Sequence, residues 1–180
     1  ATVKVGERPR GIGISPDGNE IYVAISEENK IIALDPKSLK ILREFNAGQD
    51  PEAFAVHPSG NIYISNEESA KATVINPNNG NVIAEIPVGL ESEGVAISPD
   101  GKRVIVTSES TNMLHVIAVP EHKVIFSWVH AHVQRHLPVM ANLLMRQQKL
   151  AERSLRSIWK QEKLSNVFRS VMIKQNLKIS

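Results

Sequence analysis

Three short segments that share one pattern and recur at a nearly constant interval constrain the fold of this chain more than any other feature. Each starts at a glycine and ends 12 positions later at the glycine of a Pro-Asp-Gly or Pro-Ser-Gly turn: residues 6–18, 48–60 and 89–101. The segments follow one another at intervals of 41–42 residues. Repeats of about 40–45 residues with several short strands are typical of the blades of a β-propeller.

The first repeat contains four stretches that favour β-structure, at residues 11–14, 21–25, 30–34 and 41–45. They are rich in β-branched residues, and the turn at residues 16–18 joins proline, aspartate and glycine, each of which favours a tight turn. The second repeat has matching stretches at 62–65, 72–75 and 82–86, and the third has them at 104–107, 114–117 and 124–126.

This pattern predicts an all-β fold, a partial β-propeller of three four-stranded antiparallel blades with a helical C-terminal tail. The blades are expected at residues 6–47, 48–88 and 89–127, and residues 1–5 are expected to be the outer strand of a further blade. Three blades do not close a ring, so the first and third should each have an open face. We expect self-association through these faces, and we expect Ile12, Val23, Val95 and Val106 to be less protected than in an intact ring.

Composition changes abruptly at the end of the third repeat. Residues 1–127 hold all 10 glycines, 11 basic and 17 acidic residues, and therefore carry a net charge of −6. Residues 128–180 hold no glycine, 10 basic and two acidic residues, and carry a net charge of +8. This shift predicts a boundary after residue 127 and a basic tail.

The tail has two interpretations. Its apolar residues recur near helical spacing between Lys and Arg, which predicts basic amphipathic helices able to contact a membrane surface, a nucleic acid or a partner groove. Alternatively, it is a frameshifted translation of a fourth blade. In the frame that starts at the third base of each codon, Trp128–Val129 and Met140–Ala141 must both give glycine, 12 positions apart as in the three blades. We favour the frameshift, which makes nucleic-acid binding unlikely to be a function.

The repeats also carry a family resemblance. Residues 15–18 read Ser-Pro-Asp-Gly and are followed by Ile-Tyr-Val-Ala at 21–24, and residues 98–101 and 104–107 repeat the pattern. These motifs resemble the YVTN family of β-propeller repeats, from which the second repeat departs at His57 and Ser59. Residues 106–117 are similar to the PQQ-dependent catabolism-associated group. This resemblance implies a periplasmic or extracellular propeller that is accessory to quinoprotein alcohol oxidation.

Charged residues at the entries to the blades are the candidate binding residues. They are Arg8 and Arg10 in the first blade, Glu52 in the second and Glu93 in the third. Further acidic residues follow the second strand of each repeat: Glu27, Glu28, Glu67, Glu68 and Glu109. One interpretation is a polar rim that recognises a protein or a small molecule, and the other is ordinary solvated loop charge. His57 is expected to be a turn residue.

The sequence does not point to a reaction. It has no cysteine, which excludes a disulfide scaffold and a thiolate nucleophile or metal ligand. We find no nucleophile–base pair, phosphate loop or metal signature, and so predict no catalytic residue and no cofactor. No apolar run reaches the roughly 18–20 residues that span a bilayer. The leading hypothesis is a non-enzymatic scaffold or ligand- or protein-binding module. The alternative is a fragment of a propeller enzyme or redox subunit with quinone-, haem- or lactonase-type chemistry.

Overall fold

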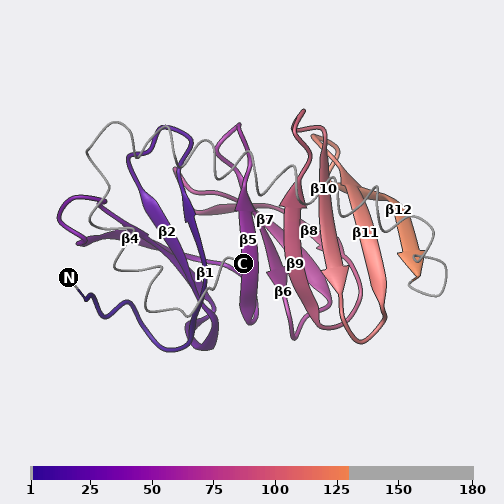
Figure 1. The fold of residues 1–180 in the computed structure, drawn as a ribbon, viewed down its shortest axis with the longest axis horizontal. Helices are drawn as coiled ribbons and strands as arrows, with labels where there is room; N and C mark the ends of the chain where they lie inside the picture. The colour runs from indigo at the N-terminus through magenta and orange to yellow at the C-terminus, as the bar shows by residue number, and fades with distance from the viewer. Residues whose placement is uncertain (1, 130–180) are drawn as a thin grey trace, which may run out of the picture.

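The computed structural model describes residues 2–129, which form three four-stranded antiparallel sheets standing side by side in chain order (Figure 1). Blade 1 contains β1 (Pro9–Ile14), β2 (Ile21–Ile25), β3 (Lys30–Leu34) and β4 (Ile41–Asn46). Blade 2 contains β5 (Pro51–Val56), β6 (Ile62–Asn66), β7 (Lys71–Asn76) and β8 (Asn81–Pro87). Blade 3 contains β9 (Ser92–Ile97), β10 (Arg103–Ser108), β11 (Met113–Ala118) and β12 (Lys123–Val129). The predicted all-β class and the three blades are confirmed.

Two predicted boundaries are wrong. The outer strand of blade 3 does not end at residue 127, because Trp128 and Val129 pair with Leu114 and Met113 and so complete the ladder along β11. Residues 2–5 form no strand, and none of the three sheets of residues 2–129 includes them. A strand needs a neighbouring strand to hydrogen-bond its backbone N–H and C=O groups. The predicted helical tail and the frameshift concern residues that lie outside the described ones, apart from this extension of β12.

Apolar side chains on alternate positions of the strands pack the blades face to face. Tyr22 and Ile31 of blade 1 meet Ile62, Ile64 and Ile75 of blade 2 in one buried cluster. This alternation follows from the period of two in a β-strand, which sends neighbouring side chains to opposite faces of the sheet. Each interior strand of blades 1 and 2 is buried on both faces, which explains why its sequence is almost continuously apolar.

A second buried cluster joins blades 2 and 3 and corrects the prediction about open faces. Tyr63 and Val74 of blade 2 pack in it with Val95, Val104 and Val106 of blade 3. The register of β9 and β10 turns Val95 and Val106 toward blade 2, so these two residues do not lie on the open face where the prediction placed them.

In blade 1 the two named residues, Ile12 and Val23, do lie on the face away from blade 2. Val23 is only 6% exposed and belongs to a third cluster, on the face of blade 1 that lies away from blade 2. Val5 and Leu39 pack against this cluster, as does Ile12, which is half-buried. Self-association through the terminal faces stays a prediction.

The innermost strands approach each other closely where the sequence has small residues. An added Cβ at Gly13 of β1 would lie 2.7 Å from the ring of Phe54 in β5. Glycine is therefore required at this position by the ring of the next blade, because a larger residue would force the two blades apart.

A buried histidine couples blade 3 to the segment that leads into it. The Gly89 N–H donates to His115 Nε2 over 2.9 Å, and His115 Nδ1 lies 2.9 Å from the hydroxyl of Ser127. Burial lowers the pKa of His115, and a protonated Nε2 could not accept the Gly89 hydrogen bond. The native state therefore holds this ring in its neutral form.

We expect the free energy of unfolding to fall as the pH drops below about 6.5, where an unfolded histidine takes up a proton that buried His115 resists. The His115→Gln variant keeps an acceptor for the Gly89 N–H but does not titrate. It should therefore lose less stability than the wild type between about pH 7.5 and pH 5.5, as measured by urea denaturation. Equal losses in the two proteins would show that His115 is not the titrating group.

Candidate functional site

One end of the blades carries a repeated backbone contact that presents charged side chains. In each blade the residue just before the inner strand has a positive φ, with values of 53° at Arg8, 46° at Asp50 and 52° at Glu91. Its carbonyl accepts a hydrogen bond from the residue that follows the second strand. The pairs are Ser26–Arg8 at 3.1 Å, Glu67–Asp50 at 3.0 Å and Glu109–Glu91 at 2.8 Å. Equivalent side chains of the three blades are thereby held at one rim.

Between blades 1 and 2 this rim is neutralised by arginine. Arg8 lies 3.3 Å from Asp50, 3.6 Å from Glu67 and 3.7 Å from Glu27. Asp50 is 9% exposed and also accepts a hydrogen bond from the hydroxyl of Ser26. A carboxylate this buried requires a partner of opposite charge, and Arg8 supplies it.

A second arginine repeats this arrangement one step along the inner strand. Arg10 donates to Glu52 over 2.6 Å. Carboxylate oxygens of Asp50, Glu52 and Glu67 lie within 4.8 Å of one another, which is the spacing of a small cation site. Arg8 contacts two of these carboxylates and Arg10 the third, so each of the three has a guanidinium partner, although two positive charges offset only part of the three negative ones.

Between blades 2 and 3 the equivalent positions bear only negative charge. At the first boundary Arg10 of blade 1 faces Glu52 of blade 2. The equivalent residues at the second boundary are Glu52 of blade 2 and Glu93 of blade 3, which are both acidic. A hydrogen bond that protonated Glu93 donates to Glu109 raises the pKa of Glu93, and desolvation and the charges of Glu109, Glu52 and Glu67 add to the effect. Desolvation and the charges of Asp50 and Glu52 raise the pKa of Glu67, despite the opposing effect of Arg8 and Arg10. This boundary therefore holds carboxylates that are short of a cation.

The structure brings all four predicted site residues to this rim. Arg8, Arg10 and Glu52 take part in direct ion pairs, and Glu93 lies in the carboxylate group beside them. Asp50 was not predicted, because before a proline it resembles an ordinary turn residue. The signal that identifies it is the repeat length, since Arg8 and Asp50 are 42 residues apart and carry opposite charge.

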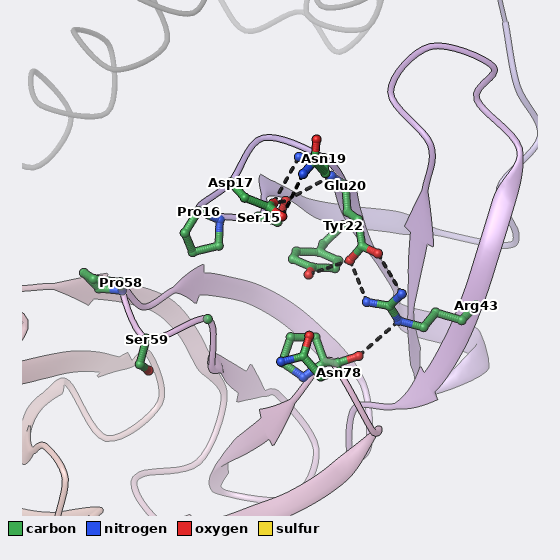
Figure 2. Close-up of a pocket in the computed structure, with 12 residues that line it drawn as sticks. Ser15, Pro16, Asp17, Asn19, Glu20, Tyr22, Arg43, Pro58, Ser59 and Asn78 are labelled. Carbon is green, nitrogen blue, oxygen red and sulfur yellow. Dashed lines mark hydrogen bonds and ion pairs between the residues drawn. The ribbon is translucent and has the colours of Figure 1, made fainter.

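A cleft of about 330 Å³ lies at the opposite end of the strands, between blades 1 and 2 (Figure 2). Two oxygens of Glu20 each lie 2.7 Å from a guanidinium nitrogen of Arg43, whose Nε donates to the carbonyl of Pro77 over 3.0 Å. The hydroxyl of Tyr22 donates to Glu20 over 2.8 Å. The other lining residues come from turns of both blades: Ser15, Pro16, Asp17, Asn19, Pro58, Ser59, Gly60 and Asn78.

His57 lies in a turn, as predicted, and also joins blades 2 and 3. Its Nδ1 is 2.8 Å from the hydroxyl of Ser59, and its Nε2 is 2.8 Å from the carbonyl of Gly101 in the next blade. Because a carbonyl can only accept, Nε2 carries the proton and Nδ1 is the acceptor. The ring thus acts in packing the blades.

Within residues 2–129 there is no helix with the length and apolar character needed to cross a membrane.

Comparison with known proteins identifies the architecture. No family model and no curated protein sequence matches the chain. Hydrazine synthase from Kuenenia stuttgartiensis is similar in structure, with a TM-score of 0.63, 30% identity and coverage of 69% of this chain and 37% of that one. Virginiamycin B lyase from Staphylococcus aureus matches with a TM-score of 0.58, 16% identity and coverage of 67% and 41%. The chain thus spans about two fifths of either protein. Both are β-propeller proteins, and the three blades described here are part of a β-propeller.

Proposed function

We propose that these blades belong to a non-enzymatic binding module that recognises a positively charged group, on a protein or a small molecule, at the carboxylate rim. We use this name for Asp50, Glu52, Glu67, Glu93 and Glu109. The observation that carries the proposal is the contrast between the two blade boundaries, one of which has arginines where the other has only carboxylates.

The ion pairs between blades 1 and 2 show how a cation could bind at the equivalent positions between blades 2 and 3. Arg8 and Arg10 reach across to acidic residues of blade 2, so the backbone frame of the rim accommodates a guanidinium between two blades. Blade 3 presents acidic residues in the same frame, and blade 2 has no basic residue at the corresponding positions. Carboxylates that repel one another are stabilised by an incoming cation.

The resemblance to YVTN repeats supports a finer version of this proposal. Under it, the chain is a YVTN-type propeller of the PQQ-dependent catabolism-associated group, located in the periplasm or outside the cell. The cationic partner would then be a protein or small molecule of quinoprotein alcohol oxidation. The motifs at residues 15–24 and 98–107 and the strand pair at 106–117 favour this assignment.

We expect the 180-residue chain to bind a lysine-rich peptide about tenfold more tightly than a glutamate-rich peptide of equal length, measured by isothermal titration calorimetry at low salt. Raising the ionic strength should weaken the binding, because the contact is made between partly exposed charges. The double variant Glu93→Gln/Glu109→Gln should lose most of this preference.

The matched control removes two carboxylates elsewhere. Glu44 and Glu85 lie on the outer strands, pair with Lys30 and Lys71, and have side chains that are 47% and 52% exposed. Glu44→Gln/Glu85→Gln changes the net charge by the same amount and should leave peptide binding nearly unchanged. Equal loss in the two double variants would mean that net charge alone attracts the peptide, and the rim would not be the site.

The pH dependence of binding is a further check. Since the pKa of Glu93 and that of Glu67 are raised, these groups take up protons at a higher pH than ordinary glutamates. As the pH falls, lysine-rich peptide binding should therefore weaken before exposed glutamates, with a pKa near 4.3, are neutralised. Binding that stays constant down to that range would contradict a role for these two carboxylates.

A second candidate is a subunit of a redox enzyme whose catalytic centre lies outside residues 2–129. The 30% identity to the chain titled hydrazine synthase, over 69% of this sequence, favours it. The test uses the immobilised 180-residue chain as bait in extracts of cells that produce it. Retention of an oxidoreductase that reduces an electron-acceptor dye would support this candidate, and retention of cationic proteins without such activity would favour the binding module.

A further inference from the structure

The two blade boundaries also differ at the end of the strands that holds the cleft. Tyr22 of β2 and Tyr63 of β6 are equivalent, since each is the second residue of its strand and faces the following blade. At the second boundary, two imidazoles surround the tyrosine. The ring centroid of His57 is 6.0 Å from that of Tyr63, and the centroid of His122 is 5.7 Å from it. His122 Nδ1 lies 3.0 Å from the hydroxyl oxygen of Tyr63.

At the first boundary both imidazoles are replaced by small residues. Ser15 is equivalent to His57, because each accepts a hydrogen bond of 2.8–2.9 Å from the glycine three residues later in its turn. Gly80 is equivalent to His122, because each is the last residue of the turn before an outer strand. Both have a positive φ, and the N–H of each donates to the carbonyl of the residue four positions earlier. The first boundary thus has a cleft where the second has two rings.

The replacement at Ser15 removes the side chain that would cross from this turn to the equivalent turn of the next blade, so that Arg43 crosses the cleft to Pro77 but no ring does. The Ser15 hydroxyl donates to Asp17 of its own turn over 2.5 Å. His57, in contrast, crosses to Gly101, and the equivalent glycine of blade 2 is Gly60, which lines the cleft. The position that the His57 ring fills between two turns is therefore open beside Tyr22.

We propose that the cleft between blades 1 and 2 binds a neutral, planar nitrogen heterocycle of imidazole size, in the position that His57 fills at the second boundary. Its N–H would donate to the carbonyl of Gly60, as His57 Nε2–H donates to Gly101. The site lies at the opposite end of the strands from the carboxylate rim, so the proposal is independent of the function proposed above.

The lining of the cleft suits a neutral ring. Arg43 and Glu20 neutralise each other through two contacts of 2.7 Å. The carboxylate of Asp17, which also lines the cleft, is engaged by hydrogen bonds from Ser15 and Asn19 within its own turn. Figure 2 shows Pro16 and Pro58 on one side of the cleft with Tyr22 and Asn78 opposite them. Proline rings offer apolar surface to a planar ligand, while the Tyr22 oxygen, which already donates to Glu20, can accept a hydrogen bond.

The test starts with the unmodified 180-residue chain and imidazole, at a pH high enough to keep imidazole neutral. Proton–nitrogen correlation NMR should show shifts of the amide signals of Ser59, Gly60 and Asn78 that saturate with concentration. N-methylimidazole lacks the N–H and should bind about tenfold more weakly. Shifts that spare these three amides, or equal affinity for the two compounds, would overturn the proposal.

Reciprocal variants make the test specific to the cleft. Ser15→His/Gly80→His introduces the rings of the second boundary and should weaken imidazole binding at least about tenfold. His122 and Leu39 carry side chains at positive φ at the positions equivalent to Gly80, which is the precedent for this change. His57→Ser/His122→Gly opens the second boundary and should add a second set of shifts, near Gly101. Unchanged binding in the first variant would overturn the proposal, whichever way the second behaves.

Discussion

Replacing Ile64 by alanine should lower the free energy of unfolding by about 3–4 kcal/mol, because it leaves a cavity between blades 1 and 2. Ile64 is completely buried and packs in the cluster that holds these blades together. Interiors of this kind are close-packed, so the surrounding side chains can only partly fill the space that three carbon atoms leave. The measurement is urea denaturation of the 180-residue chain at neutral pH.

Ile83→Ala is the matched control for this prediction. Ile83 lies on the outer strand β8 and is 42% exposed, so the same chemical change removes much less buried surface. It should cost under about 1 kcal/mol. Similar losses in the two variants would show that the contact between blades 1 and 2 is not the packed interface that the structure describes.

The second large effect is expected at Asn66, a buried amide at the end of β6. Its Nδ2 donates to the carbonyl of Ala47 over 2.7 Å, and its Oδ1 accepts from the hydroxyl of Thr73 over 2.6 Å. Asn66→Asp keeps the shape but puts a carboxylate oxygen against the Ala47 carbonyl. With its donor lost and a charge buried, the variant should lose about 3 kcal/mol at pH 7.

Acid should restore part of this stability. Burial raises the pKa of the introduced aspartate, so the native state binds a proton at a pH where the unfolded state does not, and stability rises as the pH falls through that pKa. The protonated group can again donate to Ala47. Asn81→Asp, at an exposed position of β8, is the control and should show neither the loss nor the recovery. A deficit in Asn66→Asp that is independent of pH would refute this account.

The sequence predicts the strands and turns well because their causes are local. The turn at residues 16–18 is marked by proline, aspartate and a glycine that does adopt a positive φ of 72°. The strands β2 and β6 are marked by β-branched and aromatic residues at consecutive positions, which only a sheet covered on both faces can bury. The period of the repeat then sets the order of the blades.

The ion pairs of the rim can be predicted in part from the repeat period, whereas the cleft cannot. Residues one period apart occupy equivalent places in neighbouring blades, so Arg10 and Glu52, 42 residues apart, could be paired from the sequence. Tyr63 and His122 are 59 residues apart and belong to different positions of the repeat. Their contact depends on the length of the His122 side chain, which extends from a turn toward Tyr63. The cleft beside Tyr22 likewise depends on the size of the residues at the equivalent turn positions, Ser15 and Gly80.

The backbone hydrogen bond that repeats at the rim of each blade has a consequence for the evolution of binding specificity in such a repeat. The bonds between residues 8 and 26, 50 and 67, and 91 and 109 use only N–H and C=O groups. These bonds form whichever side chains the residues carry, and arginine, aspartate and glutamate occupy the same place in successive blades. A duplicated blade can acquire a new specificity by substitution at two positions, while its scaffold stays as it was.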